Sequence, residues 1–172
     1  MSCRYLLATL LLCVGFQAAA PARARGLPPP AGPVLLTVAG AIGVTNAGGE
    51  AVFDRAMLEA LGLAKLRTAT PWTGPEVVEF EGVPVTRLLD TVRANGDTLH
   101  TTAADGYELD LPADDMRKYA VLLALRQDGQ ELRPEERGPV WIVYPRDQFR
   151  GELADETHDG RWVWQLRRIE VR

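Results

Sequence analysis

The sequence contains few of the side chains that serve as nucleophiles in hydrolases and transferases. Its one serine is Ser2 and its two cysteines are Cys3 and Cys13, so residues 14–172 offer neither a serine hydroxyl nor a thiol. Only two histidines are present. A Ser-His-Asp or thiol triad cannot be assembled from this set, and threonine, a carboxylate or an imported cofactor would have to carry any reaction.

Motifs that bind nucleotides or metals are also missing. There is no G-x-S-x-G, H-E-x-x-H or P-loop pattern, and Gly40 and Gly43 lack the spacing of a dinucleotide-binding loop. We therefore predict no catalytic residue. The 47% hydrophobic and 24% charged residues are typical of one globular domain. A formal net charge of -4 argues against nucleic acid or anionic lipid as a partner.

Long hydrophobic runs are absent except near the amino terminus. Arg4 precedes an apolar run over 5–16 that is too short to span a bilayer, and small residues follow it. We predict a signal peptide over 1–24 and a mature chain that begins at Arg25, is periplasmic or secreted, and does not insert into a membrane. Because Arg4 stands alone, the signal is of the Sec type and not of the twin-arginine type.

The remaining chain divides into a lead-in and one domain. Residues 25–33 are rich in proline and glycine, which indicates an extended segment, and residues 34–172 form the domain. Asp54 is expected to cap a short helix. A second helix is expected to open at Pro84, followed by Val85, Leu88, Leu89 and Val92 at helical spacing.

Strand patterns dominate the rest of the domain. Apolar runs at 33–42, 120–125 and 138–144 predict buried strands, and residues 162–171 are expected to form the last strand of the domain. A tight turn is expected at Glu81-Gly82 within 77–85. A hairpin is expected at 98–111, with its turn at Asp105-Gly106 and with Tyr107, Leu109 and Leu111 facing inward. The fold class is therefore α+β, with a mixed β-sheet core and short helices.

Two histidines and an acidic loop are the candidates for a metal site or a general base. The segment DETHDG places Asp155, His158 and Asp159 together, but the position of the closing calcium-loop glutamate is Leu166. Acidic loops are usually solvated, so we expect no metal there. His100 lies in a strand pattern and is expected to be a hydrogen-bonded strand residue and not a base.

Six segments occur in an order that resembles a known family. They are LRTATPW, FEGVPVTRLLD, ADGYELDLPADD, AVLLALRQDGQEL, GPVWIVYPR and WQLRRIEV. Together they resemble the molybdopterin-binding domain of sulfite-oxidase-like oxidoreductases, especially its short exported members. The resemblance runs from about Val34 to Arg172 and implies the sulfite-oxidase-like molybdopterin-binding fold, in which strands surround a pterin cleft.

The sequence departs from this family where the cofactor would be held. In catalytic members, the segment that matches LRTATPW carries a cysteine whose thiolate ligates molybdenum, and Thr68 stands at that position here. A neutral hydroxyl cannot replace a soft thiolate. The family often has a serine and a lysine that hold the pterin phosphate, where this sequence has Trp162 and Trp164. Sec export of an unfolded chain would also strip a cofactor inserted in the cytoplasm. These departures from the family therefore predict that no cofactor is bound, with molybdopterin as the alternative.

Polar and aromatic residues at the expected strand ends form the candidate ligand pocket. They are Thr68, Thr70, Trp72, Thr73, Tyr144, Arg146, Trp162 and Trp164. Trp72 follows a proline and is expected to be exposed, whereas Trp162 and Trp164 could instead be core residues on one face of the last strand. The leading hypothesis is an exported binding domain for a small ligand or a periplasmic partner such as a sensor protein, without molybdenum redox chemistry. The alternative is a molybdopterin-dependent oxidoreductase that binds its cofactor without a cysteine ligand.

Overall fold

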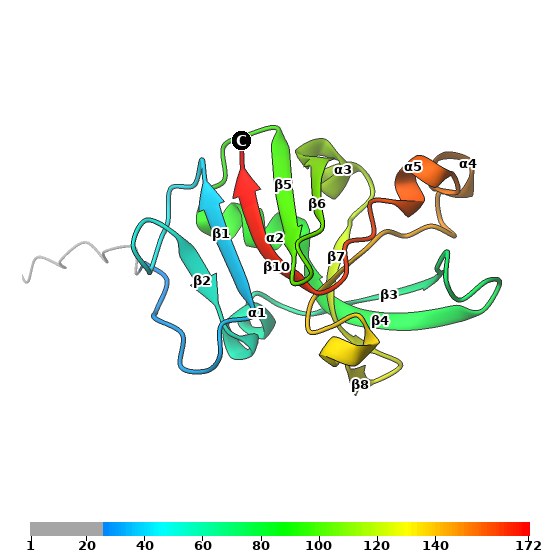
Figure 1. Ribbon diagram of the computed structural model, residues 1–172, viewed down its shortest axis with the longest axis horizontal. Coiled ribbons are helices and arrows are strands. Elements are labelled where there is room, and N and C mark those ends of the chain that lie inside the picture. Colours follow the sequence, from blue (N-terminus) through cyan, green and yellow to red (C-terminus); the bar gives the residue numbers. More distant parts are fainter. Residues whose placement is uncertain (1–25) are drawn as a thin grey trace, which may run out of the picture.

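Two β-sheets and five short helices make up residues 26–172, which the structure, a computed structural model, describes (Figure 1). The predicted signal peptide at 1–24 and its cleavage point before Arg25 lie outside the described residues. Within residues 26–172, no helix combines the length and the apolar character that crossing a membrane requires.

Along most of the chain, pairs of consecutive strands are separated by short helices. The strands are β1 (Leu36–Gly40), β2 (Ala51–Phe53), β3 (Ala64–Ala69), β4 (Val77–Pro84), β5 (Thr98–Ala103), β6 (Glu108–Pro112), β7 (Leu122–Gln127), β8 (Gln130–Glu131), β9 (Trp141–Val143) and β10 (Leu166–Val171). The helices are α1 (Arg55–Ala60), α2 (Val85–Val92), α3 (Ala113–Lys118), α4 (Arg150–Leu153) and α5 (Glu156–Asp159), with a 3-10 turn, η1, at Pro134–Glu136.

The first sheet is mixed and contains the carboxyl-terminal strand. Its strand order is β2-β1-β10-β5-β6, in which β10 lies between β1 and β5 (Figure 1). The β1–β10 pair is parallel, and the other pairs are antiparallel. The second sheet is antiparallel, with the order β3-β4-β7-β8 and with β9 paired to β7. The predicted α+β class with a mixed sheet is confirmed.

Both helices predicted from spacing form where expected. The Asp54 carboxylate accepts a hydrogen bond from Met57 N at 2.9 Å and caps α1. Its other oxygen, Oδ2, accepts from Ala31 N and Gly32 N at 2.7 and 2.8 Å, which ties the chain before β1 to this helix. Helix α2 follows Pro84 and buries its four predicted apolar residues.

The predicted tight turn at Glu81-Gly82 is wrong. Strand β4 continues through both residues, and its pairing with β7 shifts register between them, as at a β-bulge. A Cβ on Gly82 would lie 1.9 Å from the carbonyl oxygen of Leu123. The glycine therefore permits close approach of two backbones and does not reverse the chain.

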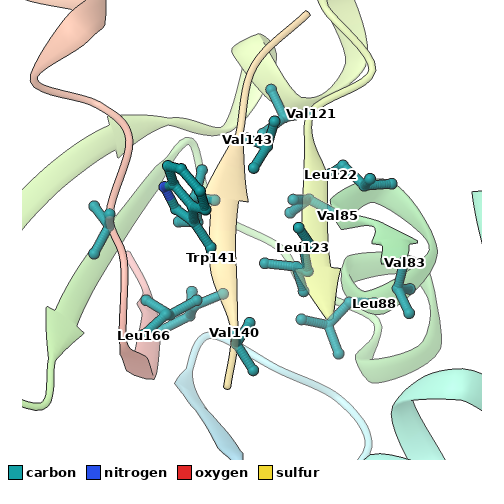
Figure 2. Close-up of a cluster of buried hydrophobic side chains, with 14 of the residues drawn as sticks. Val83, Val85, Leu88, Val121, Leu122, Leu123, Val140, Trp141, Val143 and Leu166 are labelled. Carbon is teal, nitrogen blue, oxygen red and sulfur yellow. The ribbon is translucent and has the colours of Figure 1, made fainter. Parts of the chain in front are cut away.

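One hydrophobic core joins the two sheets. Figure 2 shows part of it, where Val121 and Leu123 of the β7 region, Val140 and Trp141 near β9, and Leu166 of β10 gather in one cluster. Trp141 has no exposed surface. Because β7 has neighbours on both sides while β9 pairs only with β7, β9 is an edge strand by pairing, although all three of its residues are buried.

The segment before β10 covers the free side of β9. Ile142 N donates to Val163 O, and Leu166 N donates to Val140 O, both at 2.9 Å. The last strand begins only at Leu166, so the prediction of strand from residue 162 is wrong by four residues. Gln165 has a positive φ of 50°, which interrupts the extended backbone there. Residues 162–164 are thereby held beside Trp141.

Candidate functional site

Hydrogen bonds around Thr68 join the end of β3 to the segment that follows β9. Asp147 N donates to Thr68 Oγ1 at 3.1 Å, and this hydroxyl donates in turn to Ala69 O, also at 3.1 Å. Ala69 N donates to Asp147 Oδ2 at 2.6 Å. Thr68 is fully buried. Its hydroxyl is thus both donor and acceptor in a link between segments 79 residues apart, and no part of it is presented to solvent.

Burial and hydrogen bonding act in opposite directions on Asp147. Burial raises the pKa of its carboxyl, but the Ala69 N–H and the Arg150 guanidinium outweigh that effect, so the pKa lies below its ordinary value. The Arg150 Nη2 atom lies 2.7 Å from Asp147 Oδ1. Asp147 is therefore an ionised acceptor that stabilises this strand junction.

Two threonines shape the loop that follows β3. Thr70 N donates to Thr73 Oγ1 at 2.9 Å, and Thr73 N donates to Thr70 Oγ1 at 3.0 Å. Trp72 N also donates to Thr70 Oγ1, at 3.2 Å. Thr70 is buried, whereas the Trp72 side chain between the two threonines is 40% exposed. The expectation that Trp72 is exposed is confirmed. The hydrogen bonds between Thr70 and Thr73 close the loop, and the Trp72 indole lies partly in solvent.

All four tryptophans of the chain lie together and form what we call the tryptophan cluster: Trp72, Trp141, Trp162 and Trp164. The Trp72 ring centroid is 4.8 Å from that of Trp164, 6.0 Å from that of Trp162 and 5.9 Å from that of Trp141. The rings meet at 56–72°, in tilted and edge-to-face contacts that aromatic pairs prefer. An exposed ring is thus continuous with the core.

A cation lies against three of these rings. The Arg137 guanidinium carbon is 5.7 Å from the ring centroid of Trp72, 5.4 Å from that of Trp141 and 5.5 Å from that of Trp164. Arg137 follows η1 in the left-handed region, with φ 70°. These distances are within cation–π range. The π faces of the cluster therefore already attract a positive charge within the protein.

Two hollows flank Trp164. The smaller, which we call the aromatic cavity, has a volume of about 250 Å³. It is lined by Trp72, Asp105, Tyr107, Asp159, Gly160, Trp162, Val163 and Trp164. The larger hollow, about 610 Å³, is more open and is lined by Trp164, Arg137 and mainly acidic or amide residues of the β7–η1 region. Trp164 lines both hollows, whereas Arg137 lines only the larger one.

The structure brings together three of the predicted pocket residues, Trp72, Trp162 and Trp164, in the aromatic cavity. Trp162 is almost wholly buried and Trp164 is half-buried, and neither lies in a strand. Thr70 and Thr73 hold the Trp72 loop and do not line the cavity. Thr68 is sealed in the strand junction described above.

The remaining two predicted pocket residues have structural partners. Tyr144 is buried, and its hydroxyl donates to Asp115 Oδ2 at 3.2 Å. Burial and the charge of Asp115 raise the pKa of Tyr144 well above its ordinary value, so the hydroxyl is a neutral donor. Arg146 is half-buried and does not line the aromatic cavity, and its Nε atom donates to Asp159 Oδ1 at 3.2 Å.

Asp105, Tyr107 and Arg137 are among the residues of the site that the predicted pocket did not include. Asp105 and Tyr107 belong to the β5–β6 turn, and the prediction that Tyr107 faces inward is wrong, because it is 47% exposed. The Asp105-Gly106 turn signal was the available hint, since Tyr107 follows it directly and its N–H donates to Asp105 Oδ1 at 2.9 Å. No local pattern pointed to Arg137.

The weak metal candidates have other roles. Asp155 caps α5 by accepting from His158 N at 2.8 Å, and its carboxylate also contacts the His158 ring at 3.0 Å. The hydrogen bond from His158 N lowers the pKa of Asp155. Asp159 pairs with Arg146. Within residues 26–172, no group of three or more histidine, cysteine, aspartate or glutamate side chains is arranged to hold a metal.

His100 lies in β5, as expected, with its ring Nδ1 atom 2.7 Å from Asp110 Oδ1 on the neighbouring strand β6.

Two indole nitrogens of the tryptophan cluster lack a hydrogen-bond partner within residues 26–172. Among the described residues, the buried Nε1 atoms of Trp141 and Trp162 have no hydrogen-bond partner. Buried donors are usually hydrogen-bonded. In this cluster, the packing of the aromatic rings therefore compensates for two hydrogen bonds that are not made.

The arrangement of strands and cavity defines a protein of the sulfite-oxidase-like fold class. The structure resembles the sulfane dehydrogenase SoxCD from Paracoccus pantotrophus over 79% of this chain, with a TM-score of 0.58 and 19% sequence identity. This chain spans 37% of that one. At this identity the likeness shows the fold alone. No curated protein sequence matches the chain.

The family follows from the sequence comparison. Residues 56–149 match the model of the oxidoreductase molybdopterin binding domain, and this match extends over more than half of the chain. The chain therefore belongs to that family. The suspected family is confirmed, and so is the fold that it implied.

The side chains at the expected cofactor position do not fit a thiolate-ligated molybdenum. Residues 26–172 contain no cysteine, and the Thr68 hydroxyl is buried and engaged with Asp147 N and Ala69 O. Trp162, at a position where the resemblance puts a phosphate contact, is 3% exposed and packs among aromatic rings. An indole offers one N–H donor and no positive charge.

Proposed function

We propose that this protein is an exported binding domain of the oxidoreductase molybdopterin-binding family that carries no molybdenum redox chemistry. The observation that carries the proposal is the sealed Thr68 junction. A metal ligand must present an electron pair to a cleft, but this hydroxyl is fully buried, and its proton and one of its two lone pairs are already engaged within the fold.

The same fold offers a recognition site built from aromatic residues. The aromatic cavity combines a partly exposed Trp72 with the buried Trp162, as in pockets where one aromatic anchors a ligand and another provides a rigid wall. The occupant would be a small ligand or a segment of a periplasmic partner such as a sensor protein. Family membership supports the alternative, an oxidoreductase that holds molybdopterin without a cysteine.

Metal analysis of the full chain purified from its own host separates these two functions. We expect no stoichiometric molybdenum. A stoichiometric amount, together with a released pterin, would overturn the proposal in favour of the alternative. The variant Thr68→Cys sharpens the test: it restores a thiol at the expected position but is expected to gain neither molybdenum nor oxidase activity, because Trp162 and Trp164 keep their places.

The proposal includes Sec-type export to the periplasm or the medium. It is supported by the single Arg4 and by the short apolar run that follows it. Amino-terminal sequencing of the exported form is expected to begin at Arg25. An export defect confined to cells that lack the twin-arginine translocase would count against it.

A further inference from the structure

The aromatic cavity is lined mainly by aromatic rings and carboxylates. Its lining residues include four aromatic side chains, and the charged ones among them are two carboxylates, Asp105 and Asp159, without any basic side chain. A small hollow with π faces and negative charge disfavours an anion and favours a cation that also carries apolar surface. The ligand chemistry therefore differs from that of a phosphate-binding cleft.

The ring geometry suits a compact cation. Trp72 meets Trp164 at 64° and Trp162 at 72°, so the rings form adjoining walls and do not stack into one another. Arg137 shows that cluster rings attract a cation, but it lines the larger hollow and not the aromatic cavity. The aromatic cavity itself therefore contains no cationic side chain of the protein.

The two carboxylates are not equally compensated. Asp159 Oδ1 is paired with Arg146 Nε at 3.2 Å. Asp105 is exposed and uses Oδ1 to accept from Tyr107 N, and within residues 26–172 it makes no ion pair. One negative charge at the rim of the cavity is thus available to a ligand.

Resting on the proposed function as a binding domain, we propose that the aromatic cavity binds a small organic cation whose ammonium group carries methyl substituents. A volume of about 250 Å³ admits only a small ligand. The methyl groups would pack against the indole faces, while the charge is balanced by Asp105. A bare calcium or magnesium ion would need six or more oxygen ligands, which these side chains do not supply.

Choline and its neutral isostere 3,3-dimethylbutan-1-ol test the charge requirement, because they differ in the nitrogen that carries it. Binding is followed by tryptophan fluorescence, since all four tryptophans lie in the cluster. We expect choline to bind about tenfold more tightly than the alcohol, the ratio that a partly desolvated cation–π contact provides. Pivalate, which has a similar shape and a negative charge, is expected not to bind. Equal binding of choline and the alcohol would overturn the proposal.

Two variants assign the binding to the cavity. Asp105→Asn keeps the Oδ1 acceptor for Tyr107 N but removes the charge, and Tyr107→Leu removes an exposed ring without opening the core. Each is expected to weaken choline binding by roughly threefold to tenfold. Asp114→Asn removes the same charge from an exposed residue of α3 that does not line the cavity, and it should bind like the parent. Undiminished choline binding by both cavity variants would overturn the proposal.

Molybdenum is measured in the same preparation to separate the two hypotheses. If choline does not bind and molybdenum is absent, the cation proposal fails while the proposed binding function stands. If molybdenum is present in stoichiometric amount, the proposed function fails, whatever the choline result. Selective choline binding by metal-free protein supports both.

Discussion

The hydroxyl of Thr68 joins the end of β3 to the segment after β9. We expect Thr68→Val to lower the free energy of unfolding by about 1–3 kcal/mol, because the shape is kept while the part-buried Asp147 N loses its acceptor. The matched control is Thr102→Val in β5, a partly exposed position at which no side-chain hydrogen bond is formed. That change is expected to stay within about 0.5 kcal/mol. Urea unfolding measures the stability of both variants. Equal effects would show that the Thr68 hydroxyl does not stabilise the contact between β3 and the segment after β9.

Two members of the tryptophan cluster differ in burial and should differ in energetic role. Trp141→Ala removes a ring without exposed surface and is expected to cost about 3–5 kcal/mol of stability. Trp72 is 40% exposed, so Trp72→Ala should cost only about 1 kcal/mol from its ring contacts, while it weakens ligand binding. Urea midpoints measured together with fluorescence titrations compare the two. If Trp72→Ala unfolds as readily as Trp141→Ala, the loop after β3 belongs to the core and is not a recognition surface.

At the scale of elements, the β4–β7 pair depends on the close approach of two backbones. We expect Gly82→Ala to be strongly destabilising, because its Cβ would lie 1.9 Å from Leu123 O and backbone would have to move. Gly151 in α4 offers the contrast, since nothing lies within 4 Å of a Cβ added there. Gly151→Ala should raise stability by up to about 1 kcal/mol through helix propensity. Thermal unfolding of the two variants tests the pair, and a tolerated Gly82→Ala would contradict the bulge geometry.

Helices that depend on residues close together in the sequence could be predicted well. Helix α1 depends on a cap next to it in sequence, and α2 depends on four apolar residues at helical spacing. The turn predicted at Glu81-Gly82 is wrong because glycine occurs both in turns and where two backbones approach closely. Only the position of β7 decides between these two roles. Tyr107 was misjudged because the alternation of a strand was extended into a residue that precedes β6.

For the whole molecule, stability should fall in acid. The pKa of Asp54 is lowered, chiefly by the hydrogen bond from Met57 N, and the pKa of Asp147 is also lowered, because the Ala69 N–H and Arg150 outweigh burial. A carboxyl whose pKa is lower in the folded state binds more protons when unfolded. Its contribution is therefore complete above the ordinary value of 3.8 and is lost as the pH falls through the folded pKa.

Urea midpoints between about pH 7 and about pH 3 measure this loss. Asp54→Asn keeps an acceptor oxygen for the α1 cap but cannot titrate, so its midpoint should change less over this range than that of the parent. Two parallel profiles would mean that Asp54 does not contribute to the acid sensitivity.

By itself, the sequence determined what depends on neighbouring residues and on composition. The lack of cysteine and serine after Cys13 excluded nucleophilic triads, and periodicity and turn signals predicted most of the α+β elements. The order of segments was sufficient to suggest the family to which residues 56–149 belong. Composition, periodicity and the order of segments depend on single residues or on residues close in sequence. They can therefore be determined without knowing which strands are neighbours.

Only the tertiary structure decided how the site is built. Thr68 and Asp147 are 79 residues apart, and Trp72 meets Trp164 and Arg137 from distant parts of the chain. The sheet order and the burial of the core bring these segments together, because the free energy of closing such long loops is supplied by the packing of the whole domain. Whether a threonine is a ligand or a joint, and whether a tryptophan is core or cavity wall, depends on those long-range contacts and not on its neighbours in sequence.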